Sequence, residues 1–266
     1  MANTYTKIQL LQASVDPDNE MESEFRVLVD GQFVKYITID PGLYDPDDMC
    51  FPPAFASLLP QFPDGDWNEG RISRDPTTGT PHLVTSKVDL PGIPDIWHPA
   101  QVDHLELHVE NQLRSNVLEV ACDRFDSVVI AKFARFPWEL PRLEAESAVY
   151  KWLEGHGIGP AFLGHLTEEG RVIGFIMARI THSRHPTPGD IDVCRLALLK
   201  LHKLGIKHGD INKHNFLLHN GNVTLVDFDS ATRVTSQEEL DEELHSLDSQ
   251  LRDTSGLGGV IMEELR

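Results

Sequence analysis

The chain has 266 residues and a formal net charge of −19 at pH 7, because 42 residues are Asp or Glu and only 23 are Lys or Arg. A hydrophobic content of 40% with 24% charged residues is typical of globular proteins that bury a core, and it excludes a disordered chain. The acidic balance argues against nucleic acid or an anionic membrane as a partner, because binding phosphate groups requires clustered Lys and Arg.

The sequence also predicts neither export nor membrane insertion. No apolar run approaches the roughly 20 residues that span a bilayer, and the N-terminus lacks a basic start followed by an apolar stretch. The three cysteines, Cys50, Cys122 and Cys194, are far apart and odd in number, which favours a reducing compartment. We therefore expect a cytoplasmic protein.

Acidic residues and prolines are distributed unevenly along the chain. Residues 1–99 carry 16 acids and 6 bases and contain 12 of the 17 prolines, whereas residues 100–236 carry 17 acids and 15 bases. Residues 237–266 carry 9 acids and 2 bases. This distribution predicts a Pro-rich acidic extension with short strands over residues 1–99, followed by a more regular region.

Within the extension, the clearest element is a hairpin over residues 25–39. Asp30-Gly31 lies there between two β-rich runs, a pair that is typical of two-residue hairpin turns. Residues 41–99 are punctuated by turn residues and predict mostly irregular structure. Such a stretch is too long for a plain loop, so we expect it to wrap another surface.

From about residue 100 the pattern becomes regular. Residues 104–113 and 116–122 predict two strands joined at Arg114-Ser115-Asn116, and residues 127–134 predict a third. Pro141 is expected to open a helix that runs to about Glu154, since proline is tolerated at a first helical position.

Further along the chain, residues 171–180 predict two short strands interrupted near Gly174. Asp190 is expected to cap a helix that ends before Gly205, and a short strand follows at Ile206. Asn220-Gly221 predicts a second hairpin. Residues 237–251 predict an acidic helix whose leucines share one face that packs on the core, namely Leu240, Leu244, Leu247 and Leu251.

The densest group of polar residues lies at 208–215 and 226–229. Asp210 and Asn215 share one loop, and Asp227 ends the second strand of the hairpin. These three oxygen-bearing side chains can converge on one hard cation without any histidine ligand.

A lysine inside an apolar strand adds a second feature. Lys132 follows Val129-Ile130-Ala131, and a buried ammonium needs a partner. The next helix offers Glu144 and Glu146. Glu146 shares a helical face with the apolar residues Val149, Tyr150 and Leu153, so it is the better partner.

Together these residues resemble the protein-kinase-like superfamily, with a strand lysine, a helix glutamate, an H-x-D-x-x-x-x-N loop and a D-F-x motif. The His-Gly-Asp and Asp-Phe-Asp variants are similar to aminoglycoside kinases, lipopolysaccharide-sugar kinases and RIO-like kinases. The whole chain, including residues 155–175 and 97–99, looks like a group of fungal kinase-like proteins. The resemblance implies an α+β, two-lobed protein-kinase-like fold with an N-lobe over residues 100–180. It also implies a truncated C-terminal lobe over 181–266, after a β-rich N-terminal extension over 1–99.

The resemblance also implies ATP as a partner, Mg²⁺ as a cofactor and a transfer of the γ-phosphate to a hydroxyl of a small molecule or a protein. Lys132, oriented by Glu146, would hold the α- and β-phosphates, and Asn215 and Asp227 would bind the metal. Asp210 would accept or orient the proton of the attacking hydroxyl, while His208 braces the loop. The strand around Met177 and Arg179 would present backbone groups to the adenine.

Several positions depart from the family pattern. No G-x-G-x-x-G precedes Lys132, since the corresponding turn is 113–116. Gly209 replaces an arginine, Asp229 replaces the glycine of D-F-G, and Asn212 stands where many kinases have a lysine, although Lys213 could serve. Only 37 residues follow Asp229, too few for a peptide-binding platform.

These departures keep other functions open. The first is a pseudokinase that binds nucleotide, or nothing, and acts as a scaffold. The surplus of acids permits a further alternative, a kinase that modifies a cationic toxin or antibiotic and would need an acidic pocket for it. A zinc site is not favoured, because the spacings between the four histidines fit no helical pair of ligands: His202, His208, His214 and His219.

Overall fold

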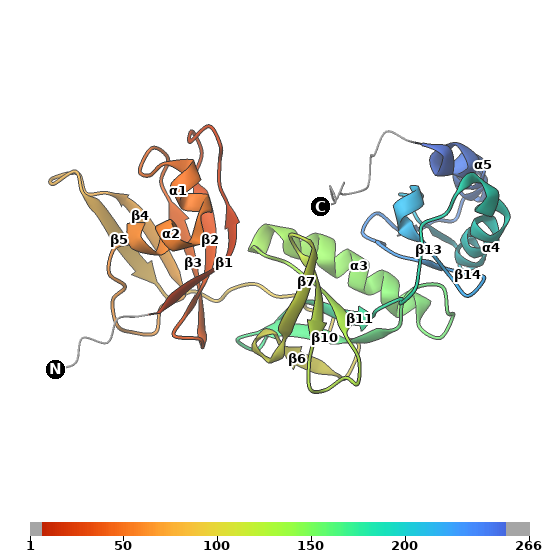
Figure 1. The fold of residues 1–266 in the computed structure, drawn as a ribbon, viewed down its shortest axis with the longest axis horizontal. Coiled ribbons are helices and arrows are strands. Elements are labelled where there is room, and N and C mark those ends of the chain that lie inside the picture. The colour runs from red at the N-terminus through yellow and green to blue at the C-terminus, as the bar shows by residue number, and fades with distance from the viewer. Residues whose placement is uncertain (1–6, 254–266) are drawn as a thin grey trace. The chain divides into compact units, whose positions relative to one another are not determined.

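The computed structural model describes residues 7–253, which contain five α-helices and several β-sheets. This confirms the mixed α+β class and is consistent with a kinase-like fold that has a small helical part (Figure 1). The chain divides after Pro91 into two compact units. This division precedes the expected boundary at residue 99, because Ile93 and Trp97 already belong to the core of the second unit.

The first unit contains a five-stranded sheet in the order β1-β2-β3-β4-β5. β3 and β4 are parallel and the other neighbours are antiparallel. The predicted hairpin is confirmed, but its connection has three residues instead of the expected two: Asp30 and Gly31, with φ angles of 52° and 71°, are followed by Gln32 before β3 begins. The strands are β1 (Ile8–Ser14), β2 (Ser23–Val29), β3 (Phe33–Ile39), β4 (Glu69–Arg74) and β5 (Pro81–Ser86).

The expectation of a mostly irregular segment over 41–99 that wraps another surface is only partly right. Much of the segment lies outside helices and strands, but it also forms α1 (Pro46–Cys50), α2 (Pro52–Leu58), β4 and β5. Its apolar side chains fill the core of their own unit, where the Phe55 ring stacks on Phe25 with centroids 4.5 Å apart. Proline was the misleading signal, because Pro46 and Pro52 stand in the first turns of the two helices, where proline starts a helix rather than breaking one.

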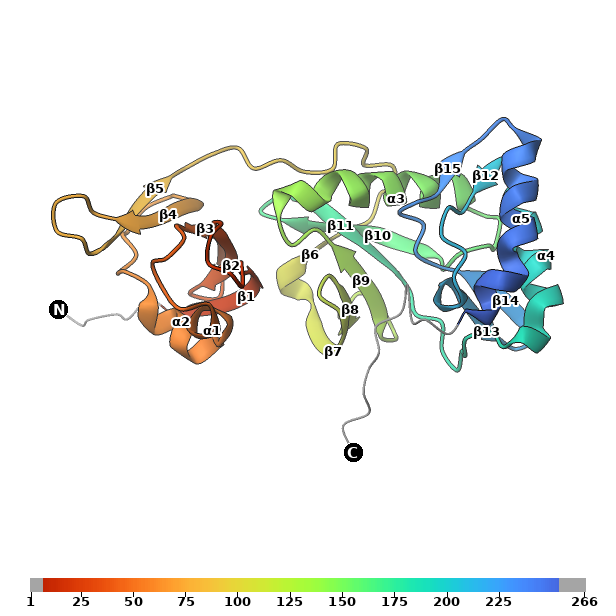
Figure 2. The ribbon, with the colours of Figure 1, turned by 90° about the horizontal axis from the view of Figure 1, so that it is seen from above.

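The second unit is built on a six-stranded sheet in the order β6-β10-β11-β9-β8-β7. The helix α3 (Leu140–Leu153) lies along one face of this sheet (Figure 2). β9 carries Lys132 at the centre of the sheet, where all five of its residues are buried. The strands are β6 (Gln101–Asp103), β7 (His108–Arg114), β8 (Val117–Ala121), β9 (Val129–Phe133), β10 (Phe162–Glu168) and β11 (Arg171–Ala178).

The expected break near Gly174 is also wrong, because β11 is one continuous strand, and β10 beside it was not predicted. Gly174 marks a close approach of backbones instead. A Cβ atom at this position would collide with the carbonyl oxygen of Lys132 in β9. The glycine therefore lets β11 pair tightly with the strand that carries the lysine.

The remainder of the second unit is a small helical part. α4 (Ile191–His202) and α5 (Gln237–Arg252) lie side by side, next to the hairpin of β13 (Phe216–His219) and β14 (Asn222–Leu225) (Figure 2). β12 (Ile206–Lys207) pairs with β15 (Thr232–Arg233). The leucine face of α5 packs inward as predicted, with three leucines buried and Leu244 half-buried. Asp190 precedes α4 but makes no cap hydrogen bond to it, because its carboxylate binds Arg184 and Thr187.

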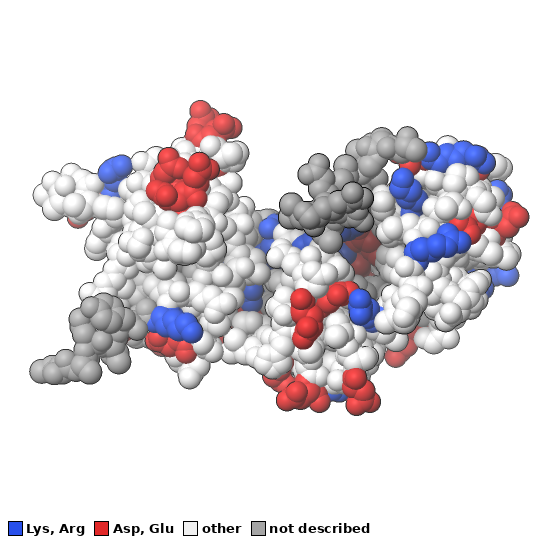
Figure 3. Space-filling model, in the orientation of Figure 1, with Lys and Arg blue, Asp and Glu red and all other residues white. Residues whose placement is uncertain are grey.

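Two further features concern the surface and the segment before the sheet. Figure 3 shows a patch of acidic side chains over α1, where Asp45, Asp47 and Asp48 surround the first turn. Trp97 stands against the Phe162 ring, with centroids 4.3 Å apart, and its indole N–H donates to Ser147.

No helix within residues 7–253 is long and apolar enough to cross a membrane.

Candidate active site

The loop between β12 and β13 holds Asp210 through two amide side chains. Asn212 Nδ2 lies 2.9 Å from both carboxylate oxygens of Asp210. Asn215 Nδ2 donates to the Asp210 carbonyl at 2.8 Å and to its Oδ2 at 3.0 Å. The lysine next to them points elsewhere, since Lys213 Nζ donates to the carbonyl of Asp253. In this loop the amide of Asn212 therefore orients the carboxylate.

A buried glutamate of α5 fixes the start of the same loop. Glu243 accepts hydrogen bonds from the backbone N–H groups of His208 and Gly209, at 3.0 and 2.7 Å, and from His202 Nε2 at 2.7 Å. Burial alone would raise the pKa of Glu243, yet His202 and the two loop amides lower it. Sequence reasoning missed this residue. The available signal was a carboxylate at helical spacing between Leu240 and Leu247 on an apolar face.

The strand lysine contacts two carboxylates. Lys132 Nζ lies 2.6 Å from Glu146 Oε2 and 2.6 Å from Asp227 Oδ1. Lys132 is 6% exposed and Glu146 is fully buried, so the ammonium and the carboxylate neutralise each other where water has little access. Burial would lower the pKa of Lys132, but the two carboxylates raise it, so the ammonium stays charged. The structure thus pairs the lysine with Glu146, as the helical face predicted.

Asp227 is held in an uncommon backbone conformation between two cations. Its φ angle of 64° lies in the left-handed region, which non-glycine residues rarely adopt outside turns and functional sites. Its second oxygen, Oδ2, accepts from Arg114 Nη1 at 2.8 Å. Burial would raise the pKa of Asp227, but Lys132 and Arg114 lower it to about 2. Asp227 therefore presents a permanent negative charge at neutral pH.

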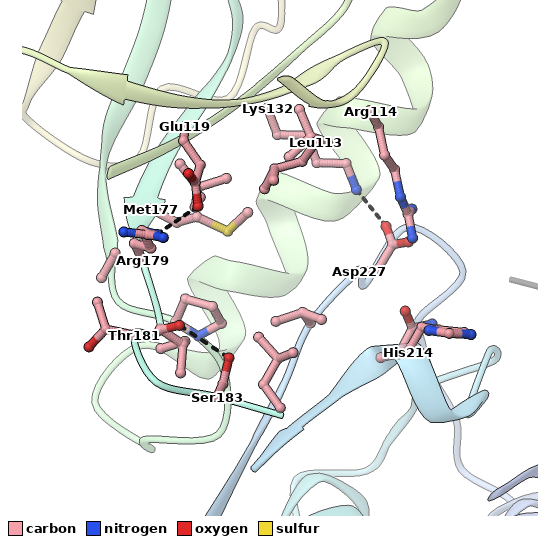
Figure 4. A pocket seen from close by; sticks show the side chains of 18 of the residues that line it. Leu113, Arg114, Glu119, Lys132, Met177, Arg179, Thr181, Ser183, His214 and Asp227 are labelled. Atoms are coloured by element: carbon pink, nitrogen blue, oxygen red, sulfur yellow. Dashed lines mark hydrogen bonds and ion pairs between the residues drawn. The ribbon is translucent and has the colours of Figure 1, made fainter. Parts of the chain in front are cut away.

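These groups lie at the polar end of a cavity of about 470 Å³. Figure 4 shows Lys132 and Arg114 pointing toward Asp227, while Met177 and Arg179 lie at the other end. The guanidinium of Arg179 is itself held 2.6 Å from Glu119 Oε1. The apolar part of the lining is formed by Leu113, Val117, Ile130, Met177, Ala178, Ile180 and Leu217.

Asp210 is connected to this cavity by its hydrogen bond to Asn215. Asn215 is among the described residues that line the cavity and Asp210 is not, although the two are hydrogen-bonded. The structure therefore brings Lys132, Glu146 and Asp227 into direct contact and joins Asp210 to Asn215 as a second pair. Met177 and Arg179 line the same cavity.

The donor set fits a hard divalent cation. Asp227 supplies an ionised carboxylate, and Asn215 turns its amide nitrogen to Asp210, which leaves its carbonyl oxygen as the atom that can ligate a metal. Oxygen donors of this kind match Mg²⁺, with the remaining positions available to phosphate and water oxygens.

A zinc centre is not supported among residues 7–253, where no group of three or more His, Cys, Asp or Glu residues could hold a metal ion. Three of the four histidines have separate partners. His202 binds Glu243, His208 Nε2 contacts the Val226 carbonyl, and His219 contacts Thr224. His208 is fully buried against the Phe228 ring, where burial lowers its pKa, so it packs under the site.

A second cavity, of about 570 Å³, lies beside the turn between β7 and β8. It shares Arg114, Lys132 and Asp227 with the first cavity and adds Arg142, whose Nε lies 2.6 Å from Asp229 Oδ2. Asp229, which replaces a glycine in the family motif, is therefore engaged in an ion pair with α3.

Comparison with known proteins bears on the part of the chain that carries the loop and the hairpin. Residues 192–257 match the model of the lipopolysaccharide kinase (Kdo/WaaP) family, and no curated protein matches the chain. The matched segment contains Asp210, Asn215 and Asp227, whereas Lys132 and Glu146 lie outside it and are joined to it by the fold. Over this segment the match confirms the resemblance to lipopolysaccharide-sugar kinases within the protein-kinase-like superfamily, and it supports a phosphotransferase of the kinase type.

Proposed function

We propose that residues 92–266 form an ATP- and Mg²⁺-dependent phosphotransferase that transfers the γ-phosphate to a hydroxyl group of a small molecule or a protein. The observation that carries this proposal is the position of Lys132, 2.6 Å from both Glu146 and Asp227 at the end of a mostly apolar cavity. A buried cation next to an ionised metal-binding carboxylate is what a triphosphate with its cation requires.

Each residue has a part in this proposal. The apolar lining would enclose the nucleobase, next to backbone groups of the strand end around Met177 and Arg179. Lys132, kept charged and oriented by Glu146, would bind the α- and β-phosphates. Asn215 and Asp227 would hold Mg²⁺, which supplies neutralisation of the phosphate charge when it is bound.

Asp210 would orient the acceptor hydroxyl and take its proton. A bond then forms between the acceptor oxygen and the γ-phosphorus, and the bond from that phosphorus to the bridging oxygen of ADP breaks. Asn212 and Asn215 hold the Asp210 carboxylate for this task. Positioning of this kind accounts for most of the catalysis that phosphoryl transfer needs.

The test is Mg²⁺-dependent ATP hydrolysis and autophosphorylation of the full chain, compared with Asp210→Asn. General-base catalysis contributes about 10²–10⁴-fold, so the variant is expected to lose at least about 100-fold in rate while it still binds ATP. Asp192→Asn is the matched control, since Asp192 is an exposed aspartate on α4. Equal rates for wild type and Asp210→Asn would remove Asp210 from the mechanism.

A pseudokinase that acts as a scaffold is the second candidate, favoured by the glycine-free turn between β7 and β8 and by Arg114 on Asp227. A thermal shift separates the two. A ligand at 100 times its dissociation constant stabilises a protein by about 2.7 kcal/mol. Stabilisation by Mg²⁺-ATP without any turnover would favour the pseudokinase, and turnover would exclude it. The acceptor, the fungal grouping and a cytoplasmic location stay predictions.

A further inference from the structure

The turn between β7 and β8 has too little backbone to enclose phosphates. Arg114 pairs with Val117 across the hairpin, so Ser115 and Asn116 alone connect the strands. A glycine-rich loop binds phosphates through several backbone N–H groups that glycine leaves accessible. This turn contains no glycine, and only Ser115 and Asn116 could offer it backbone N–H groups.

The side chain of Arg114 extends from this hairpin to Asp227, into the region that a glycine-rich loop would cover. Arg114 extends from the end of β7 to Asp227, with Nη1 2.8 Å from Oδ2, and its side chain is 37% exposed (Figure 4). It lines both cavities, together with Lys132 and Asp227. A guanidinium is the side-chain group best suited to phosphate, because it donates two parallel hydrogen bonds and stays charged.

The present partner of Arg114 is also the carboxylate that a metal ion would need. Lys132 contacts one oxygen of Asp227 and Arg114 contacts the other. A divalent cation bound to Asp227 would stand next to the guanidinium, and the two positive charges would repel each other strongly in a partly buried site. Arg114 would therefore be displaced from Asp227 when a cation binds, and the phosphates that arrive with the cation would offer the guanidinium a new anionic partner.

We propose, on the basis of the proposed function, that Arg114 is the phosphate-binding group of this hairpin and takes the place of a glycine-rich loop. In the protein without nucleotide it neutralises Asp227. When nucleotide and cation bind together, the guanidinium transfers from the carboxylate to the phosphates.

This exchange makes predictions of opposite sign for different ligands. Removing the guanidinium should weaken every ligand that carries a phosphate chain and should leave a nucleoside without phosphates unaffected. It should also strengthen the binding of a divalent cation alone, since Asp227 then loses a competing positive charge. A purely structural role for Arg114 would change none of these affinities selectively.

The experiment measures binding by calorimetry to wild type, Arg114→Ala and Arg114→Lys, with Mg²⁺-ATP, tripolyphosphate, adenosine and Mn²⁺ alone as probes. Arg114→Ala is expected to bind Mg²⁺-ATP and tripolyphosphate at least 10-fold more weakly, adenosine within twofold, and Mn²⁺ more tightly. Arg114→Lys should recover part of the loss, since it keeps the charge without the planar fork. Arg124→Ala is the control, because Arg124 is an exposed arginine of the same sheet region that pairs with Glu106.

Thermal unfolding followed by circular dichroism shows which variants are folded, and only folded variants are compared with wild type. Unchanged or tighter Mg²⁺-ATP binding by Arg114→Ala would overturn the inference and leave the proposed function standing. Loss of tripolyphosphate binding in Arg114→Ala, with no ATP binding by wild type, would support the inference while the proposed function fails. A wild type that binds neither ATP nor tripolyphosphate would overturn both.

Discussion

Each of the two units buries a lysine in a strand of its sheet, and the partners of the two lysines are of different kinds. Lys35 of β3, 7% exposed, donates to the Trp67 carbonyl and lies 3.9 Å from the centroid of the Trp67 ring. Lys132 of β9, 6% exposed, contacts the carboxylates of Glu146 and Asp227. Burial alone therefore does not indicate whether a strand lysine belongs to the proposed active site.

The partners make that distinction. Lys35 contacts the carbonyl and the ring of Trp67, both within the first unit. Lys132 joins α3 to the end of β14 across the second unit, beside a cavity that can hold a ligand. A buried ion pair adds little to stability compared with apolar packing, so its presence beside a cavity is a reason to propose a function for it.

The largest expected effect separates the two lysines by activity. Lys132→Met should reduce Mg²⁺-dependent turnover by at least about 100-fold, because a preorganised cation at the phosphates contributes on the order of 10²–10³-fold. Lys35→Met should leave turnover within about twofold and lower the stability of the first unit. Turnover is measured on protein shown to be folded by hydrogen exchange. Equal losses of activity in the two variants would break the comparison.

Glu243 and Asn68 provide a second contrast between the units, since both are buried polar residues that bind backbone groups. Glu243→Gln should lower the free energy of unfolding by about 2 kcal/mol, because hydrogen bonds to a charged acceptor are lost, and it should also reduce turnover. Asn68 holds Val88 in the first unit, so Asn68→Ala should cost stability without changing turnover. Chemical denaturation and ATP hydrolysis check both variants.

Two strand glycines compare the packing of the sheets. A Cβ at Gly70 of β4 would meet the ends of the Leu83 and Ile37 side chains, which can move, whereas one at Gly174 would meet backbone of β9. Gly174→Ala should therefore cost about 1–3 kcal/mol and displace Lys132, and Gly70→Ala should cost less. Gly189→Ala serves as a neutral control, because its Cβ would make an ordinary contact. Equal shifts of the unfolding midpoint from wild type in the Gly70 and Gly174 variants would contradict this.

A fall in pH should lower the contribution of Asp227 to the stability of the second unit and raise that of Glu24 to the stability of the first. Asp227 has a pKa lowered from 3.8 to about 2, so its contribution is fully present above pH 4 and is lost as the pH falls toward 2. That contribution is about 2 kcal/mol. Glu24 of the first unit has a pKa raised by burial and by Glu22, so protonation favours its folded form. Asp227→Asn should flatten the acid dependence of the second unit in denaturation measured from pH 5 to pH 2.

The local signals in the sequence predicted part of each unit. Turn residues located one hairpin in the first unit and one in the second, and helical spacing chose Glu146 over Glu144 as the partner of Lys132. The order of motifs placed Asp210, Asn215 and Asp227 in one region. These inferences depend on short-range patterns or on a family resemblance, and both are visible in a single sequence.

What the sequence did not predict depends on contacts between distant segments. β10 was missed because its polar residues are buried by neighbouring strands rather than by an alternating pattern. Arg114 and Glu243 act on groups more than thirty residues away, at Asp227 and at the loop of Gly209. The core of the first unit was hidden by prolines, whose position at helix starts became evident only in three dimensions.

The hydrogen bonds from the backbone of His208 and Gly209 to Glu243 have a consequence for the order of folding during synthesis. The sheet with Lys132 and the loop with Asp210 both leave the ribosome before α5, which supplies the glutamate. Domains fold largely as they are made, but this loop can be fixed only after the last described helix has emerged. A nascent chain would thus contain the strand of Lys132 early and would acquire the fixed loop of Asp210 last.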